Sequence, residues 1–244
     1  MLNNYQLGLI IIILCGAIVG YLSGSILFAL VIEKIIHSDK IKKFGSGNPG
    51  FTNTYRVYGK KISLLVLALD LLKTILPILI FWAIYLSCFK DSFDAQITKY
   101  YNPGMFIYIP GIFAFIGHLF PIYFKFKGGK GVACIGAMYL CISPFIALIG
   151  VIILIVVIKW KKMMSLAVLI ACIILPWLVF VPGISWNYLI YPNIIDSVQV
   201  NINSPGIFAE LFGILILMSI TIFARHTKNI KNIINKKENK VKSI

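Results

Sequence analysis

Charged residues are scarce in this 244-residue chain, where Asp, Glu, Lys and Arg together make up 13% of the sequence. A soluble domain carries about twice that share. Hydrophobic residues make up 59% of the chain, so too few polar side chains are present to cover a water-soluble globule. An ordinary soluble enzyme and an intrinsically disordered chain are both excluded. We therefore expect a polytopic membrane protein that forms a single domain over residues 1–244.

Acidic residues and cysteines are also few. Eight Asp and Glu stand against 23 Lys and Arg, which gives a net charge of +15. The basic residues border apolar segments, as the positive-inside rule predicts, and no separate basic face is present, so we expect no nucleic-acid partner. The five cysteines form no CxxC pair and are odd in number, which argues against a disulfide framework or a zinc site. We expect no metal and no cofactor.

Long apolar runs dominate the sequence. The first run is preceded by residues 1–6, which contain no Lys or Arg, so we predict that no signal peptide is cleaved. Four intervening segments are basic, namely residues 40–61, 125–130, 159–162 and 225–242. We place these four in the cytoplasm and the other two loops outside. The six apolar runs are Leu7–Ile32, Ser63–Leu86, Met105–Phe124, Val132–Ile158, Met164–Pro182 and Ile207–Phe223.

The fourth run, Val132–Ile158, begins and ends at basic flanks, so it must cross the membrane an even number of times. Ser143-Pro144 lies near its centre, where proline interrupts the helical hydrogen-bond ladder. Two arms of about 12 residues reach about 18 Å each, short of a core of about 30 Å. We predict a hairpin of two short or tilted helices, or a re-entrant loop. The chain is then all-α with about seven transmembrane helices, its N-terminus outside and its C-terminus cytoplasmic.

Three polar clusters fall on the predicted cytoplasmic side. The first runs from Gly45 to Arg56 and has three glycines in six residues, which allow close approach to a ligand. Asn48-Pro49 predicts an N-cap and first helical position, and the N–H groups of such a helix start favour an anion. Thr52 and Arg56 would share one face, where a guanidinium beside hydroxyl and amide donors suits phosphate. A polar turn between two spans is the alternative for this cluster.

The second cluster is the glycine-rich loop Phe126–Gly131, which contains Lys130 and precedes an apolar run. It predicts an anion-binding loop that opens a helix, but it is not a Walker A loop, because GxxxxGK[ST] is absent. The third cluster contains His226 and Asn229, three residues apart and expected on one helical face. A structural histidine is the alternative there. Because the three clusters contain almost no carboxylate, we expect an anionic ligand, best a phosphate, with a lipid or acyl partner.

Two further polar features lie inside predicted spans. We interpret His118, in the third run, as a packed and hydrogen-bonded histidine. Asp70 and Lys73, three apart in the second run, most simply pair with each other.

Three long stretches now identify a family. They are GSGNPGFTNTYRVYGKK from Gly45, GHLFPIYFKFKGGKGVA from Gly117 and RHTKNIKNIINKKENK from Arg225. Along nearly its whole length the chain resembles the bacterial acyl-phosphate:glycerol-3-phosphate acyltransferases (PlsY family). The resemblance implies transfer of a fatty acyl group from acyl phosphate to the 1-hydroxyl of glycerol 3-phosphate, giving lysophosphatidic acid and phosphate, the first acylation of phospholipid synthesis. It implies an enzyme of the bacterial cell membrane, among membrane lipids, with its active site on the cytoplasmic face, and we expect a monomer.

The resemblance also assigns residues. Phe51, Thr74 and Lys228 depart from the family pattern. Because Lys228 stands beside His226 and Asn229, the resemblance does not predict which contacts hold the third motif in place. The catalytic residues that it implies are Ser46, Arg56, Lys130, His226 and Asn229, the substrate- and phosphate-binding residues Gly45, Gly47, Asn48, Thr52, Asn53, Gly128, Gly129 and Gly131, and the structural residue Glu238.

Several mechanistic alternatives stay open. The proton of the attacking hydroxyl goes either to the substrate's own phosphate, which we favour, or to His226. Ser46 could instead be an acyl-enzyme nucleophile, for which it needs a neighbouring base. A transporter of organic phosphates is the rival from another class, although basic clusters on one side alone speak against it. An acyl-CoA-dependent enzyme with a His-x-x-x-x-Asp motif is excluded, because the motif is absent, and a purely structural protein would not need three phosphate-binding loops.

Overall fold

The computed structural model describes residues 4–88, 103–181 and 205–240, and these residues contain helices and no strand, which confirms the all-α prediction. Residues 89–102 and 182–204 contain most of the two loops predicted to be external and lie outside the described residues. The chain divides into two compact units, the first running up to Met138 and the second beginning at Tyr139. The single domain over residues 1–244 stays a prediction.

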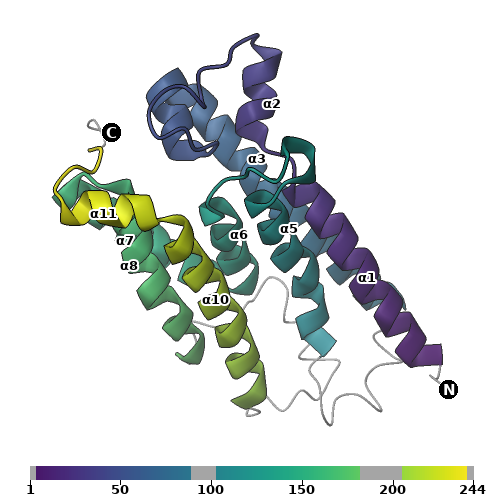
Figure 1. Cartoon of the computed structure of the whole chain (residues 1–244). Coiled ribbons are helices and arrows are strands. Elements are labelled where there is room, and N and C mark those ends of the chain that lie inside the picture. The colour runs from purple at the N-terminus through teal and green to yellow at the C-terminus, as the bar shows by residue number, and fades with distance from the viewer. Residues whose placement is uncertain (1–3, 89–102, 182–204, 241–244) are drawn as a thin grey trace. The chain divides into compact units, whose positions relative to one another are not determined.

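The first unit carries the N-terminal helices (Figure 1). The first predicted apolar run is divided, because the chain bends by 44° between its two helices. The third helix is interrupted at Gly59, whose φ of 79° and ψ of −171° are not helical, so its first two turns form a short separate segment. The elements are α1 (Asn4–Gly24), α2 (Phe28–Ile35), α3 (Phe51–Cys88), η1 (Pro103–Tyr108), α5 (Ile109–Leu119) and η2 (Ile122–Phe124), followed by α6 (Val132–Ile142), which begins in this unit.

Small residues bring α1 and α5 into backbone contact. A Cβ on Gly20 would overlap the carbonyl oxygen of Pro110, and a Cβ on Gly24 would overlap that of Ala114. The two helices therefore pack more closely than larger side chains would allow, as is typical of helix pairs in membranes. This packing fixes the end of α5 that leads into the second polar cluster.

The second unit carries α7 (Pro144–Lys161), α8 (Met164–Ile174), η3 (Leu175–Phe180), α10 (Pro205–Arg225) and α11 (Thr227–Ile234). The predicted break at Ser143-Pro144 is confirmed. Pro144 is the first residue of α7, and the Ser143 side chain accepts a hydrogen bond from the backbone N–H of Ile146 at 3.4 Å. The two arms are unequal, since α6 has 11 residues and α7 has 18, so the expectation of two half-length arms was wrong for α7.

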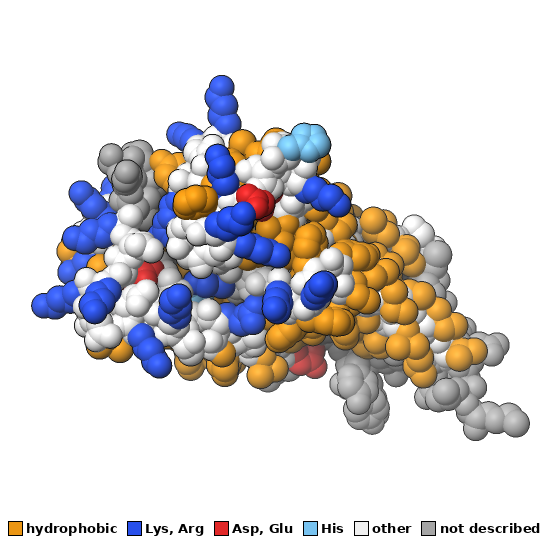
Figure 2. Space-filling view, turned by 45° about the horizontal axis from the view of Figure 1, so that its top comes forward, with side chains coloured by type: hydrophobic (Ala, Val, Ile, Leu, Met, Phe, Trp, Pro, Cys, Tyr) orange, Lys and Arg blue, Asp and Glu red, His pale blue; other side chains and the backbone are white. Residues whose placement is uncertain are grey.

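The helices have the length and surface of membrane spans. Among the described residues, three helices are long and apolar enough to cross a membrane, or up to five if each bent pair counts as one span. Exposed apolar side chains line α7, where Leu148, Ile152 and Val156 are each at least half exposed. Figure 2 shows Lys and Arg side chains around the polar loops and hydrophobic side chains along the helices beside them. Apolar helix surfaces next to basic loops are typical of a membrane-embedded protein.

Candidate active site

The first polar cluster forms a loop followed by the short helical segment of α3. The helix begins at Phe51 rather than at Asn48-Pro49, so the predicted N-cap was wrong. The helix starts later because the chain first makes a tight turn, in which the N–H of Gly50 donates to the carbonyl of Asn48 at 3.0 Å. The ladder then starts at Gly50, whose carbonyl accepts from the N–H of Thr54 at 3.0 Å. Thr52 and Arg56 lie four residues apart within the helical start of α3, which confirms the prediction that they share one helical face.

Two glycines shape this loop. Gly45 and Gly47 have φ angles of 65° and 70°, a left-handed region that favours glycine. A Cβ on Gly45 would overlap Oδ1 of Asn53 and lie 3.6 Å from Cδ of Arg56. Gly45, directly before the exposed Ser46, therefore lets the loop lie against Asn53 and the half-buried Arg56.

Asn53 lies beneath the loop and is 1% exposed. Its Oδ1 accepts a hydrogen bond from the backbone N–H of Ser46 at 2.7 Å. Its Nδ2 donates to the carbonyl oxygens of Ile41 at 2.8 Å and of Phe44 at 3.2 Å. One side chain thus holds three backbone groups of the loop.

The second polar cluster is a loop pressed against the end of α5. The N–H of Gly129 donates to the carbonyl of His118 at 3.0 Å. A Cβ on Gly128 would overlap that same carbonyl, and a Cβ on Gly129 would overlap Nε2 of His118. Gly131 has a φ of 80°, and α6 follows at once, so the predicted glycine-rich loop that opens a helix is confirmed. Lys130, between these glycines, is half-buried.

A buried charged group supports this loop from within the membrane-spanning part of the unit. Lys73 Nζ lies 2.8 Å from Oδ1 of Asp70, 2.9 Å from Nδ1 of His118 and 2.7 Å from the carbonyl oxygen of Ile26. Because an ammonium only donates, Nδ1 of His118 is the acceptor and its Nε2 carries the proton in the neutral ring. The prediction of a paired Asp70 and Lys73 and of a packed, hydrogen-bonded His118 is confirmed.

The third polar cluster lies at a bend in the second unit. The chain turns by 63° between α10 and α11, and His226 occupies the N-cap position of α11, three residues before Asn229. His226 is 3% exposed, and its Nδ1 lies 2.8 Å from the carbonyl oxygen of Ile222. Since a carbonyl only accepts, Nδ1 carries the proton, and Nε2 of the neutral ring is then an acceptor.

Asn229 is held by two side chains in the same unit. Its Nδ2 donates to Ser165 Oγ at 2.8 Å and to Glu238 Oε1 at 2.9 Å, and Ser165 Oγ donates to the same carboxylate oxygen at 2.6 Å. Glu238 is 8% exposed and ties the C-terminal segment to α8 and α11. The sequence reasoning did not single out Ser165. Its signal is a lone hydroxyl at the start of an apolar helix, directly after the basic residues 159–162.

The structure thus brings the predicted residues together in two groups. Ser46, Arg56, Asn53 and the second glycine-rich loop belong to the first unit, where α2, the start of α3 and the loop before α6 lie toward the same end (Figure 1). The histidine, asparagine and glutamate of the third cluster belong to the second unit. In the described parts of the chain, no group of three or more His, Cys, Asp or Glu could hold a metal ion. Arg56 and Lys130, beside the N–H groups of the glycine-rich loops, have the composition of an anion site.

A helical, multi-pass membrane protein with glycine-rich basic loops is the class that this fold and site define. A family profile described as Glycerol-3-phosphate acyltransferase matches residues 13–236. The chain belongs to the glycerol-3-phosphate acyltransferase family and is an enzyme of that kind.

Individual relatives agree with this assignment. The chain is 39% identical over 239 residues to a glycerol-3-phosphate acyltransferase of Ureaplasma parvum, across 97% of this chain and 90% of that protein. It is 35% identical to one of Mycoplasma pneumoniae, across 98% of both. Its structure is similar to a crystal structure of PlsY, an integral membrane glycerol 3-phosphate acyltransferase, in the glycerol 3-phosphate form, with a TM-score of 0.70 and 29% identity over 94% of this chain and 96% of that chain. The lysophosphatidic acid form of PlsY gives a TM-score of 0.69.

Proposed function

We propose that this enzyme transfers a fatty acyl group from acyl phosphate to the 1-hydroxyl of glycerol 3-phosphate. The products are 1-acyl-glycerol 3-phosphate (lysophosphatidic acid) and inorganic phosphate. The observation that carries the proposal is the glycine-rich loop around Lys130, which opens α6 in the same unit as the Ser46 and Arg56 loop. Related structures hold glycerol 3-phosphate and lysophosphatidic acid, which supports the acceptor and the product. The donor is proposed from the family resemblance and from the chemistry below.

Acyl phosphate is a mixed anhydride, so its phosphate is already a good leaving group. The substrate hydroxyl oxygen attacks the carbonyl carbon, the bond from that carbon to the phosphate oxygen breaks, and phosphate leaves. The enzyme therefore mainly has to position two anions and offset their repulsion. Arg56, Lys130 and the N–H groups of the loop at Gly128, Gly129 and Gly131 serve this purpose in the proposal. Ser46, with the donors near it at Gly45, Gly47, Asn48 and Thr52, completes the phosphate-binding set.

The fate of the proton follows from the scarcity of protein bases in the clusters. We assign the proton of the attacking hydroxyl to the phosphate of the substrate itself, and we assign His226 and Asn229 to holding the acceptor. His226 is the second candidate base, because its Nδ1 is committed to the Ile222 carbonyl and its Nε2 is the acceptor nitrogen. An acyl-enzyme on Ser46 is less favoured, because Ser46 Oγ lies 3.4 Å from the N–H of Asn48, a donor and not a base.

We also propose the topology. Five candidate spans together with the two shorter apolar helices Val132–Ile142 and Met164–Phe180 make up the seven predicted transmembrane helices. The N-terminus is then outside, and the basic loops, the active site and the C-terminus are cytoplasmic. The proposal treats the enzyme as a monomer of the bacterial cell membrane that forms one catalytic domain, with Glu238 as a structural residue.

The test is a comparison of donors. Purified protein in detergent receives labelled glycerol 3-phosphate with either acyl phosphate or acyl-CoA. We expect labelled lysophosphatidic acid with acyl phosphate alone. Activity only with acyl-CoA would retain the acyltransferase and refute the donor. A transporter would be favoured instead if glycerol 3-phosphate binds, neither donor gives a product, and proteoliposomes take up glycerol 3-phosphate in chemically unmodified form.

A further inference from the structure

We infer that Glu33 and Asn53 are positioning residues that hold the Ser46 loop in place, and that Asn53 does so in place of binding substrate. The inference rests on the proposed function in one respect, which is that Ser46 takes part in the reaction. It starts from a continuous chain of hydrogen bonds that joins α2 to the backbone of Ser46. Ile41 and Asn53 are its two intermediate members.

The backbone N–H and the carbonyl oxygen of Ile41 are both held by buried side chains. Its N–H donates to Glu33 Oε1 at 2.6 Å, and its carbonyl oxygen accepts from Asn53 Nδ2 at 2.8 Å. Ile41 itself is fully buried, and Glu33 is only 6% exposed. A buried carboxylate that accepts a backbone N–H is a charge-assisted hydrogen bond in a low-dielectric site, where such bonds are strongest. Ile41 is therefore a fixed point from which the loop up to Ser46 departs.

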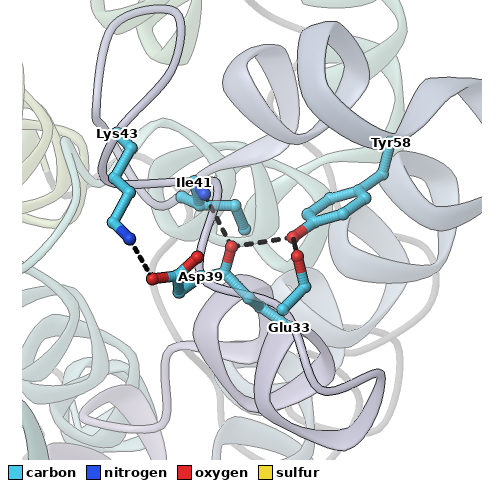
Figure 3. A network of polar contacts seen from close by, with 6 residues as sticks. Glu33, Asp39, Ile41, Lys43 and Tyr58 are labelled. Atoms are coloured by element: carbon cyan, nitrogen blue, oxygen red, sulfur yellow. Dashed lines mark hydrogen bonds and ion pairs between the residues drawn. The ribbon is translucent and has the colours of Figure 1, made fainter.

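A second contact fixes the carboxylate itself (Figure 3). The hydroxyl of Tyr58, at the end of the short segment of α3, donates to Glu33 Oε1 at 2.8 Å, and it lies 2.6 Å from Oγ of Ser38. One oxygen of Glu33 thus receives hydrogen bonds from the loop and from α3. The carboxylate joins α2, the loop and the helix that carries Arg56.

Asn53 links the fixed Ile41 backbone to the backbone of Ser46. Its Nδ2 spans the carbonyls of Ile41 and Phe44, and its Oδ1 takes the N–H of Ser46 at 2.7 Å. At 1% exposure, with both polar atoms on loop backbone, this amide is oriented toward the loop and away from solvent. Gly45 makes the contact possible, because a Cβ there would overlap Oδ1 of Asn53. The asparagine therefore acts on the substrate through the position of Ser46.

The same loop provides a matched control. Lys43 and Asp39 form an ion pair four residues apart, with side chains 63% and 73% exposed, and this pair lies outside the chain from Glu33 to Ser46 (Figure 3). Exposed pairs of this kind contribute little to stability. Asp39→Asn consequently removes a polar contact of the loop and leaves the Ile41 and Asn53 hydrogen bonds intact.

The test combines hydrogen exchange with kinetics on the purified full chain. In Glu33→Ala and Asn53→Ala, we expect the backbone amides of residues 41–48 to exchange about tenfold faster or more, as the loss of one buried hydrogen bond implies. We expect turnover to fall about 100-fold, the cost of a displacement near 1 Å at a reacting group. Glu33→Gln keeps an accepting oxygen for the Ile41 N–H and is expected to restore slow exchange and most of the turnover. Asp39→Asn is expected to match the wild type in both measurements.

Three results would overturn the inference. Unchanged exchange at residues 41–48 in Asn53→Ala would show that the amide does not hold the loop. Fast exchange with wild-type turnover would show that the position of the loop does not matter for the reaction. A raised KM at unchanged exchange would make Asn53 a substrate ligand. Failure of the donor assignment is distinguishable, because the exchange measurement uses no substrate and the kinetics can be repeated with whichever donor the wild type accepts.

Discussion

Gly129→Ala probes the second glycine-rich loop most sharply. A Cβ at this position would overlap Nε2 of His118 and lie 3.0 Å from its Cδ2 and Cε1. The imidazole cannot move aside without breaking a contact, since its Nδ1 lies 2.9 Å from Lys73 Nζ and that ammonium is also held by Asp70. The loop must therefore shift by about 1 Å to reach ordinary van der Waals separation. A shift of this size next to Lys130 predicts a loss in kcat/KM of about 100-fold, or about 2.7 kcal/mol of transition-state stabilisation.

The assay is initial-rate acyl transfer by purified variants in detergent, with thermal unfolding as a check on folding. Gly136→Ala is the matched control, because a Cβ at Gly136 meets nothing within 4 Å. A second variant tests the cause. In His118→Asn combined with Gly129→Ala, the shorter side chain still offers an oxygen to Lys73 and leaves room for the new methyl group, so we expect most of the activity to return. Wild-type rates for Gly129→Ala, or a double variant no better than the single one, would refute the steric reasoning.

Three further predictions concern the helix packing, the buried ion pair and the third motif. Gly24→Ala forces a methyl group into the backbone of α5 and is expected to lower stability by about 1–3 kcal/mol in thermal unfolding, whereas Gly213→Ala, with nothing within 4 Å, is expected to be neutral or slightly stabilising. Lys73→Met leaves the buried carboxylate of Asp70 without its ion pair and is expected to cost about 3–5 kcal/mol, so an unchanged melting temperature would contradict the assigned pairing. Ser165→Ala removes its hydrogen bonds to the third-motif amide and to the Glu238 carboxylate, and it is expected to reduce turnover by about tenfold and to lower stability by about 1–3 kcal/mol in thermal unfolding.

Much of the fold follows from the sequence because membrane spans leave a strong local signal. Apolar runs with basic flanks predicted the helices, and parity with a central proline predicted the division between α6 and α7. The pairing of Asp70 with Lys73 followed from their spacing on one helix face. These features depend on neighbouring residues, so one sequence is sufficient to predict them.

Other features depend on contacts between distant segments and could not be predicted. The helix start moved from Asn48-Pro49 to Phe51 because Gly50 makes a tight turn first. The bend at His226 could not be predicted, because no proline or glycine lies next to it in the sequence. Ser165 gains its place in the site through Asn229 and Glu238, which lie 64 and 73 positions further along the chain.

Asn53 illustrates the same difficulty within a motif. Its sequence neighbours make it look like one more phosphate donor, and only the carbonyls of Ile41 and Phe44 show where its amide is directed. A motif shows which residues gather at a site, whereas the division between residues that touch the ligand and residues that hold the loop is made by tertiary hydrogen bonds.

The central claim is direct acyl transfer from acyl phosphate to glycerol 3-phosphate. The most direct measurement supplies the purified enzyme with acyl phosphate labelled in its phosphate and glycerol 3-phosphate labelled in its glycerol carbon. We expect one labelled inorganic phosphate for each labelled lysophosphatidic acid, and no release of phosphate when glycerol 3-phosphate is omitted. A stoichiometric burst of phosphate without the acceptor, with the acyl group retained on the protein, would contradict direct transfer and favour an acyl-enzyme.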